Sequence, residues 1–363
     1  MGSSTPRRRD GASLTTSSST SRTVTADVFA SVTGRLQLVN PLELSKEVIC
    51  EPGTVVAVRA LAENPLYPDV EKCDGEFVKV KQGMIIVGAL GSRQALRGFV
   101  GYSPYKLAQG DTLHLLNLGG VIGRCIGGHK DVGEAIPVEV LGCVAKGRRV
   151  LTIRHGALPE VQVLGRTRPV ILVLGSCMNV GKTAATTEII RRFTKDGVKV
   201  GAGKVSGVAA MRDTRKMALA GAVKVYNFVD CGYPSTVDAN DVGAIARSIV
   251  AKLDAEDVDL IVMELGDGIL GHYKVDTVLR DTALMANVAA IVFCAGDLVA
   301  AWGGKEILGG LGVNIDVISG PATDNCAGTT YLENALGVKA ANAITETEKL
   351  YRILAPKVAL SHA

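Results

Sequence analysis

Residues 170–183 read Val-Ile-Leu-Val-Leu-Gly-Ser-Cys-Met-Asn-Val-Gly-Lys-Thr, and the architecture of the C-terminal half follows from this stretch. Five consecutive apolar residues at 170–174 are typical of a buried strand in a parallel sheet. A short loop flanked by glycines comes next, and residues 184–187 continue into a helix. A strand, such a loop and a helix start in direct succession predict a site where backbone N–H groups and a helix N-terminus bind phosphate.

The loop matches most of the P-loop pattern, in which a Lys contacts the β- and γ-phosphates and a Ser or Thr hydroxyl binds Mg²⁺. We therefore predict that Lys182 contacts phosphate and that Thr183 binds the metal. The usual spacing would place the first glycine at Ser176, but here it is Gly175. The residues predicted to bind the cofactor are Gly175, Ser176, Cys177, Met178, Asn179, Val180, Gly181, Lys182, Thr183, Thr186 and Asn325.

Apolar strands alternate with amphipathic helices after residue 169. Strands are predicted at 170–174, 198–205, 260–263, 289–294 and 315–319, and helices at 182–196, 214–222, 239–254, 274–285 and 298–310. This alternation predicts a doubly wound parallel α/β sheet covered by helices on both faces. Ligands of such sheets bind at the carboxyl ends of the strands.

Five residues separate the two glycines of the loop, and Val180 precedes Gly-Lys-Thr. In these respects the loop resembles that of dethiobiotin synthetase, and it also resembles the P-loop half of the D-glutamate N-acetyltransferase family. The resemblance covers roughly residues 168–340. It implies that Lys204, at the end of the next strand, faces the γ-phosphate and the substrate. It also implies that Glu264, where the family has Val-Glu-Gly and this chain has Glu-Leu-Gly, holds or orients Mg²⁺.

Lys182, Lys204 and Glu264 are accordingly the predicted catalytic residues, and Thr183, Glu264 and Asp213 the predicted metal ligands. Asp213 either binds a second Mg²⁺ or caps the helix that follows it.

Arg212, Asp267 and His272 are assigned to the substrate. Arg212 either binds an anionic substrate or is solvated. Asp267 either acts with Glu264 or forms a turn, and His272 is either an acid or base on a lid or a helix cap.

Asn325 follows the last predicted strand and offers a donor and an acceptor to a purine edge. The NKxD signature of guanine-specific GTPases is missing. ATP is therefore the expected nucleotide.

The N-terminal half has a different organisation. Residues 25–165 contain short apolar or alternating runs broken by Gly, Asp and Pro, which predicts a smaller β-rich domain, a barrel or a sandwich. Five glycines between 117 and 128 indicate either tight corners or a binding loop. Residues 1–24 are rich in Ser, Thr and Arg and predict a disordered tail. The α/β domain is assigned to residues 166–363. No motif in the β-rich half resembles a known family.

Composition excludes several classes of function. The formal charge is +4, but four Arg and one Asp among the first 23 residues supply most of it. Only 15 residues are aromatic. Because the rest of the chain shows neither a basic face nor stacking aromatics, nucleic-acid binding is not expected. The eight cysteines form no CxxC pair and the five histidines no zinc motif. No apolar stretch approaches about 18 residues, so no membrane span is expected.

Together these features predict an Mg-ATP-dependent ligase, synthetase or kinase that activates a small polar carboxylate or amine. One alternative is an acyl-CoA-dependent N-acyltransferase whose P-loop holds coenzyme A. Another is a MinD-like regulatory or metal-delivery NTPase, although the second Lys typical of that group is absent from residues 176–178. A homo-oligomer in the cytoplasm is expected, with organelle import through the tail as the open alternative.

Overall fold

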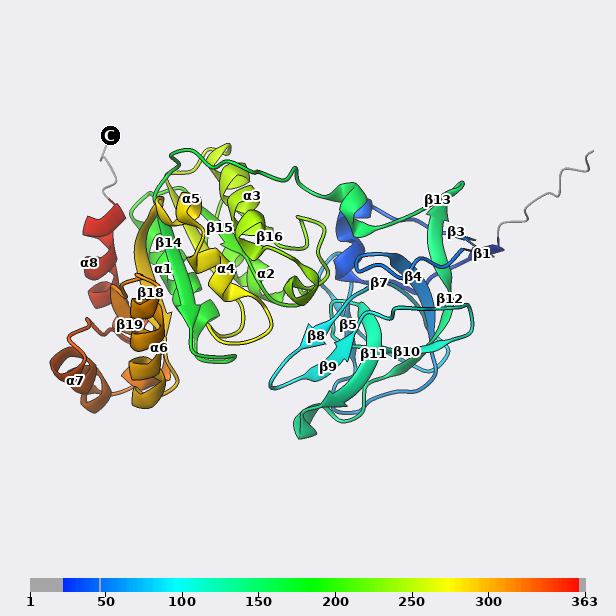
Figure 1. The fold of residues 1–363 in the computed structure, drawn as a ribbon, viewed down its shortest axis with the longest axis horizontal. Coiled ribbons are helices and arrows are strands. Elements are labelled where there is room, and N and C mark those ends of the chain that lie inside the picture. The colour runs from blue at the N-terminus through cyan, green and yellow to red at the C-terminus, as the bar shows by residue number, and fades with distance from the viewer. Residues whose placement is uncertain (1–21, 46, 359–363) are drawn as a thin grey trace, which may run out of the picture.

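The computed structural model describes residues 22–45 and 47–358, and these form two lobes side by side along the longest axis (Figure 1). The strands of the first lobe lie between residues 22 and 150, and those of the second between 170 and 319. Residues 157–169 connect the lobes without a helix or strand. The tail predicted at 1–24 lies outside the described residues as far as residue 21. Its last three residues, Arg22–Val24, form β1, because their backbone pairs with residues 42–44.

The second lobe is built on a parallel sheet of six strands in the order β16-β15-β17-β14-β18-β19. The strands are β14 (Val170–Gly175), β15 (Val200–Lys204), β16 (Lys224–Asn227), β17 (Leu260–Glu264), β18 (Val288–Cys294) and β19 (Val317–Ser319). All except the edge strand β16 are largely buried. The P-loop strand β14 lies in the middle, between β17 and β18.

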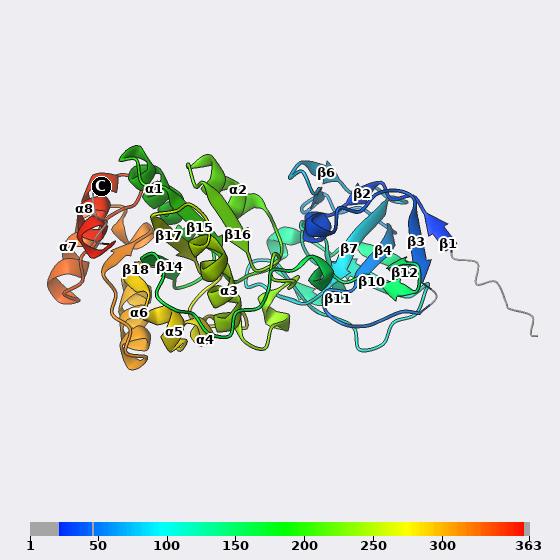
Figure 2. The same cartoon turned by 90° about the horizontal axis from the view of Figure 1, so that it is seen from above.

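Helices cover both faces of this sheet, which confirms the predicted mixed α/β class with a parallel sheet. The helices are α1 (Lys182–Lys195), α2 (Arg212–Leu219), α3 (Val242–Asp254), α4 (Val275–Leu279), α5 (Thr282–Met285), α6 (Leu298–Gly310), α7 (Cys326–Ala335) and α8 (Thr347–Val358). In Figure 2, α1 and α2 lie above the sheet and α3 to α6 lie below it.

The two faces follow from the alternation of side chains along a strand. In β14, Leu172 and Leu174 pack into the core under α3 and α6, whereas Ile171 and Val173 pack into the core under α1 and α8. A strand buried on both faces needs apolar residues at every position, which is why residues 170–174 are continuously apolar.

The structure differs from the predicted elements in three places. The helix expected at 274–285 is two short helices. The first ends at Leu279 with Arg280 as its C-cap, and Asp281 caps the second by accepting a hydrogen bond from Leu284 N at 2.9 Å. The edge strand β16 was not predicted, since its exposed or half-buried residues form no apolar run. Helices α7 and α8 were also missed.

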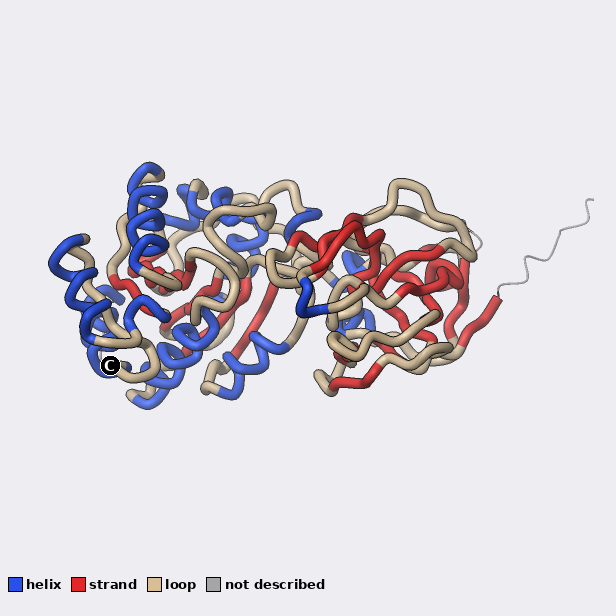
Figure 3. Tube along the Cα trace, turned by 90° about the horizontal axis from the view of Figure 1, so that it is seen from below, coloured by secondary structure: helices blue, strands red, loops and turns tan. Residues whose placement is uncertain are grey.

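The first lobe is a small barrel. Its strands are β1, β2 (Val28–Phe29), β3 (Leu42–Ser45), β4 (Val55–Ala60), β5 (Asp69–Glu71), β6 (Phe77–Lys79), β7 (Ile85–Leu90), β8 (Arg93–Gln94), β9 (Phe99–Tyr102), β10 (Thr112–Leu115), β11 (Val121–Gly128), β12 (Pro137–Lys146) and β13 (Arg149–Val150). The pairings β12·β4, β4·β7, β7·β11, β11·β10 and β10·β12 close a ring. Apolar side chains from these strands fill the barrel. The first lobe is nearly all strand and loop in Figure 3, and the second carries most of the helix.

The sheet of this lobe is mixed rather than purely antiparallel, because β7 pairs in parallel with both β2 and β11. No helix of the described residues is long and apolar enough to cross a membrane.

The lobes contact each other through loops of the barrel and the segments that follow β15 and β17. A Cβ added to Gly119 would lie 1.9 Å from the carbonyl oxygen of Ala209, so only glycine fits there. Asn117 donates to the same oxygen, and the hydroxyl of Tyr273 accepts from Gln94 N at 3.2 Å. One glycine of the cluster at 117–128 therefore serves the contact between lobes.

Candidate functional site

A cavity of about 540 Å³ lies at the carboxyl ends of β14, β15 and β17, where a doubly wound sheet binds its ligands. Most of its lining comes from the P-loop, from the segment that leads into α2, and from the end of β17. The barrel lobe closes the opposite wall with Tyr67, Arg93, Ala95, Arg97, Asn117 and Leu118. The cavity is therefore formed jointly by both lobes.

The P-loop takes its shape from residues at each of its ends. A Cβ on Gly175 would lie 2.7 Å from the carbonyl oxygen of Cys294 in the neighbouring strand, so the displaced first glycine is explained by strand packing. Asn179 and Gly181 have φ angles of 61° and 87°, and Gly181 is the N-cap residue of α1. The Nζ of Lys182 donates to the carbonyl oxygen of Cys177 at 2.6 Å. The Lys side chain thus reaches back over the loop.

The two strand ends beside the loop bring a carboxylate and an ammonium together. Lys204 and Glu264 are register partners on the adjacent strands β15 and β17, so both side chains emerge at the same edge of the sheet. Glu264 Oε1 accepts a hydrogen bond from Thr183 Oγ1 at 3.0 Å and lies 3.7 Å from Lys204 Nζ. Lys204 also donates to Asp213 Oδ2. Four of the predicted residues therefore form one connected cluster.

Electrostatics keep Lys204 and Asp213 ionised. Burial opposes the charge of Lys204, but Glu264 and Asp213 together outweigh it and raise the pKa of this ammonium. Burial likewise opposes the charge of Asp213, and Lys204 outweighs it, so the pKa of Asp213 is lowered. These two residues form a charged pair.

The other two ionisable groups of the site respond mainly to burial. Desolvation raises the pKa of Glu264, although Lys204 opposes this effect. Burial lowers the pKa of Lys182, although Glu264 opposes that shift. Burial disfavours the ionised form of both groups, so a ligand of opposite charge would stabilise that form of each.

The donor set fits a bound Mg²⁺. Glu264 is 2% exposed, and its Oε2 has no hydrogen-bond partner in the described residues. A carboxylate oxygen beside a Thr hydroxyl is the protein contribution that Mg²⁺ takes in P-loop sites, with phosphate oxygens and water completing its shell. Within residues 22–45 and 47–358, no group of three His, Cys, Asp or Glu residues could hold a metal. Such a shell would thus need ligands beyond the protein.

The remaining predicted residues are divided between the cavity and its surroundings. Arg212, Asp213 and Asp267 line the cavity together with Met178 and Asn179. Asp267 has a φ of 63°, and burial raises the pKa of its carboxyl.

Seven predicted residues lie outside the lining: Gly175, Ser176, Cys177, Val180, Thr186, His272 and Asn325. Val180 packs into the core, and the hydroxyls of Ser176 and Thr186 are buried without a hydrogen-bond partner among the described residues. His272 is exposed, and the side chain of Asn325 accepts from the N–H groups of residues 327 and 328 as the cap of α7. Contacts of His272 and Asn325 with a ligand stay predictions.

The residues that sequence reasoning missed come mainly from the other lobe. Tyr67, Arg93 and Arg97 lie far from the P-loop in the chain, and no motif marks them. Lys216 and Tyr273 also line the cavity and were not selected. A helical spacing of four from Arg212 would have placed Lys216 on the same side of α2.

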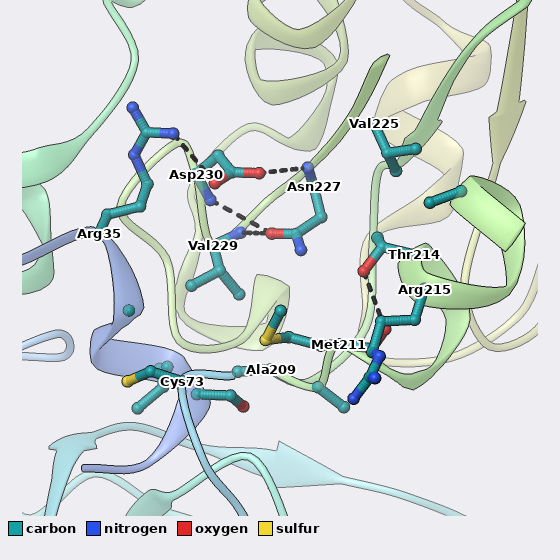
Figure 4. A pocket seen from close by; sticks show the side chains of 15 residues that line it. Arg35, Cys73, Ala209, Met211, Thr214, Arg215, Val225, Asn227, Val229 and Asp230 are labelled. Atoms are coloured by element: carbon teal, nitrogen blue, oxygen red, sulfur yellow. Dashed lines mark hydrogen bonds and ion pairs between the residues drawn. The ribbon is translucent and has the colours of Figure 1, made fainter. Parts of the chain in front are cut away.

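A second cavity of about 350 Å³ lies between the lobes on the other side of α2 (Figure 4). The charged side chains Arg35, Asp230 and Arg215 that line it all have partners within the protein. Arg35 pairs with Asp230 at 3.2 Å, and the carbonyl oxygen of the Asn227 side chain accepts from Val229 N at 2.8 Å. Arg215 donates to the carbonyl oxygen of Gly75. This cavity therefore carries little unmet charge, in contrast to the one at the strand ends.

No protein-family model matches the chain, and no curated protein matches it. Solved structures that resemble it include the signal recognition particle receptor FtsY from Elizabethkingia anophelis, at 14% identity and a TM-score of 0.38 over 48% of this chain and 58% of that one. FtsY from Thermotoga maritima is 15% identical, with a TM-score of 0.36 over 50% of this chain and 63% of that one. The 54 kDa signal recognition particle protein from Aeropyrum pernix, solved with GDP, is 18% identical, with a TM-score of 0.37 over 55% of this chain and 50% of that one.

The chain therefore spans between 50% and 63% of the length of these structures. This lobe combines a six-stranded parallel sheet, a P-loop-like loop after the central strand β14, and a cluster of Thr183, Lys204 and Glu264 at the strand ends.

Proposed function

We propose that this protein is an Mg-ATP-dependent enzyme that transfers a phosphoryl group to a small polar metabolite, as a kinase or as a ligase or synthetase. The observation that carries the proposal is the cluster of Thr183, Lys204 and Glu264 beside the P-loop Lys182. Phosphoryl transfer depends mainly on positioning and on the stabilisation of charge, and these residues supply both.

Lys182 and Lys204 act on the phosphates. In the free protein Lys182 donates to a carbonyl of its own loop, and a phosphate oxygen would be a stronger, charged acceptor. Lys204 is held ionised by its carboxylate neighbours and lies at the strand end where the γ-phosphate would be. Its ammonium would stabilise the negative charge that develops during transfer.

Thr183 and Glu264 would hold Mg²⁺, with the free Oε2 of Glu264 as one ligand. The ion would supply charge neutralisation at the phosphate oxygens. Asp213 has no buried carboxylate oxygen without a partner in the described residues. Its Oδ2 accepts a hydrogen bond from Lys204, which favours a role in positioning that ammonium. Its predicted role as a second metal ligand stays a prediction.

The resemblance of the loop to that of dethiobiotin synthetase also supports this proposal. The residues on which it depends, Lys204 and Glu264 included, line one cavity with Lys182. No specific observation favours the coenzyme A or regulatory alternatives. Both differ from the proposal in the ligand that they require, so binding measurements can separate them.

The test is a thermal-shift comparison of the full chain with Mg-ATP, Mg-GTP, ADP and acetyl-CoA. We expect stabilisation by Mg-ATP that Lys182→Ala abolishes, while Lys195→Ala, at the exposed far end of the same helix, leaves it unchanged. Stabilisation by acetyl-CoA without any by Mg-ATP would overturn the proposal. A larger shift with Mg-GTP than with Mg-ATP would reassign the nucleotide.

A further inference from the structure

The cavity of about 540 Å³ at the strand ends is lined by more cationic than anionic side chains. Six cationic side chains face three carboxylates: Arg93, Arg97, Lys182, Lys204, Arg212 and Lys216 against Asp213, Glu264 and Asp267. The cavity therefore has an excess of positive charge at neutral pH, and its ligands must be anionic overall.

Phosphates in the P-loop would account for only part of this excess. Lys182 and Lys204 lie at the strand ends, whereas the other four cations come from the barrel wall and from α2. Of these four, Arg212 alone makes an ion pair within the described residues, with its Nε 3.7 Å from Asp213 Oδ1. That carboxylate is already shared with Lys204. Within the described residues, the second end of the cavity thus holds three cations without a carboxylate partner, Arg93, Arg97 and Lys216, and a fourth, Arg212, that shares its carboxylate.

Arg93 indicates that this end of the cavity is a preorganised binding site. It is 6% exposed, its Nη1 donates to the carbonyl oxygen of Leu116, and its Nε has no partner in the described residues. Its guanidinium lies 5.7 Å from the ring centre of Tyr67 and 6.0 Å from that of Phe99. A buried guanidinium without a carboxylate is costly, so its retention on a cavity wall requires an explanation.

The loop between β8 and β9 packs against this arginine. A Cβ added to Gly98 would meet Arg93 Nη2, so the loop backbone passes close to the guanidinium. The same loop carries Arg97, which is exposed and lines the cavity. The barrel therefore presents two arginines to the cavity, one buried and one exposed.

We propose that the barrel lobe provides the acceptor subsite, and that Arg93 and Arg97 together with Arg212 and Lys216 bind a small molecule bearing carboxylate groups. The proposal rests on the proposed phosphoryl transfer only in calling this molecule the acceptor. Arginine forks match the two oxygens of a carboxylate, which gives orientation as well as attraction. The substrate would then lie between the lobes, with one end at Lys204 and the other on the barrel wall.

The test measures binding by titration calorimetry on the full chain, with succinate, glutarate, D-glutamate and L-glutamate as probes. Succinamide is the neutral match, and inorganic phosphate reports any general preference for oxyanions. We expect at least one carboxylate to bind and succinamide not to bind. Arg97→Gln should weaken that carboxylate at least tenfold and leave Mg-ATP binding unchanged. Arg148→Gln, an exposed arginine outside the cavity, should change neither.

Arg212→Gln provides a second exposed position, so the result does not depend on the fold tolerating a change at Arg93. Lys182→Ala should lose nucleotide binding and keep carboxylate binding, which separates this subsite from the proposed function.

The proposal is overturned if no carboxylate binds, if succinamide binds equally well, or if phosphate alone binds. It is also overturned if Arg97→Gln and Arg212→Gln both bind the carboxylate like the native chain.

Discussion

Replacing Lys204 with Met tests the electrostatic description of the site. The ammonium lies between Asp213 and Glu264, and the three side chains are 14%, 15% and 2% exposed. Removing one partner of a buried ion pair costs about 3–5 kcal/mol. Because Lys182 still attracts Glu264, we expect the lower end, a loss of about 3 kcal/mol at pH 8. For a lobe of this size that is roughly a 6–12 °C fall in Tm.

The loss should depend on pH in a direction that the pKa shifts define. In the native chain the pKa of Asp213 is lowered, so its stabilisation is present above the pKa of an unfolded Asp and is lost as the pH falls through the folded value. Without Lys204, burial and mutual repulsion raise the pKa values of both carboxyls. Groups with raised pKa destabilise the fold as the pH rises, so Lys204→Met should be least stable at pH 8 and recover towards pH 5.

Thermal denaturation of the full chain at pH 5 and pH 8 measures both effects. Lys79→Met, an exposed lysine in β6, is the control for loss of a positive charge. The double variant Lys204→Met with Asp213→Asn should recover part of the loss, since one uncompensated carboxylate is gone. A Tm within about 2 °C of the native value at pH 8, or a defect that deepens on acidification, would refute the reasoning.

Two further predictions concern the contact between the lobes. Gly119→Ala places a Cβ against the carbonyl oxygen of Ala209 and should lower the free energy of unfolding by about 1–3 kcal/mol. Gly127→Ala, where a Cβ would meet open space, is the control and should be nearly neutral. Equal Tm values for the two variants would contradict this account. Glu71 is fully buried in the barrel and accepts from Met211 N at 2.7 Å, so Glu71→Ala should lower stability by about 1–3 kcal/mol in chemical denaturation. Glu71→Gln retains an acceptor oxygen and should lose less.

Much of the α/β lobe could be predicted because its signals are local. The strand at 170–175 and the helix after Lys182 need only the hydrophobic pattern of their own residues, and the structure has both within one residue of the expected limits. Strand β16 and helices α4 and α5 were harder. An edge strand lacks a continuous apolar run, and a single capping Asp is enough to divide a helix.

The arrangement of Glu264 and Lys204 could be predicted only in part. Each ends an apolar strand, and parallel strands align their carboxyl ends, so a meeting at one edge could be expected from the pattern and the resemblance. The hydrogen bonds of Lys204 with Asp213 and of Thr183 with Glu264 could not be predicted, because they depend on how the loops after the strands turn back.

The P-loop could be recognised from residues 170–183 alone, because its phosphate ligands are consecutive backbone N–H groups and neighbouring side chains. The far wall of the cavity could not. Arg93 and Arg97 reach it only because the barrel closes and its loops dock against residues 207–211, where Gly119 allows a close approach. Local pattern therefore sufficed to predict a phosphate site, whereas the docking of the two lobes placed the second set of cations opposite the P-loop.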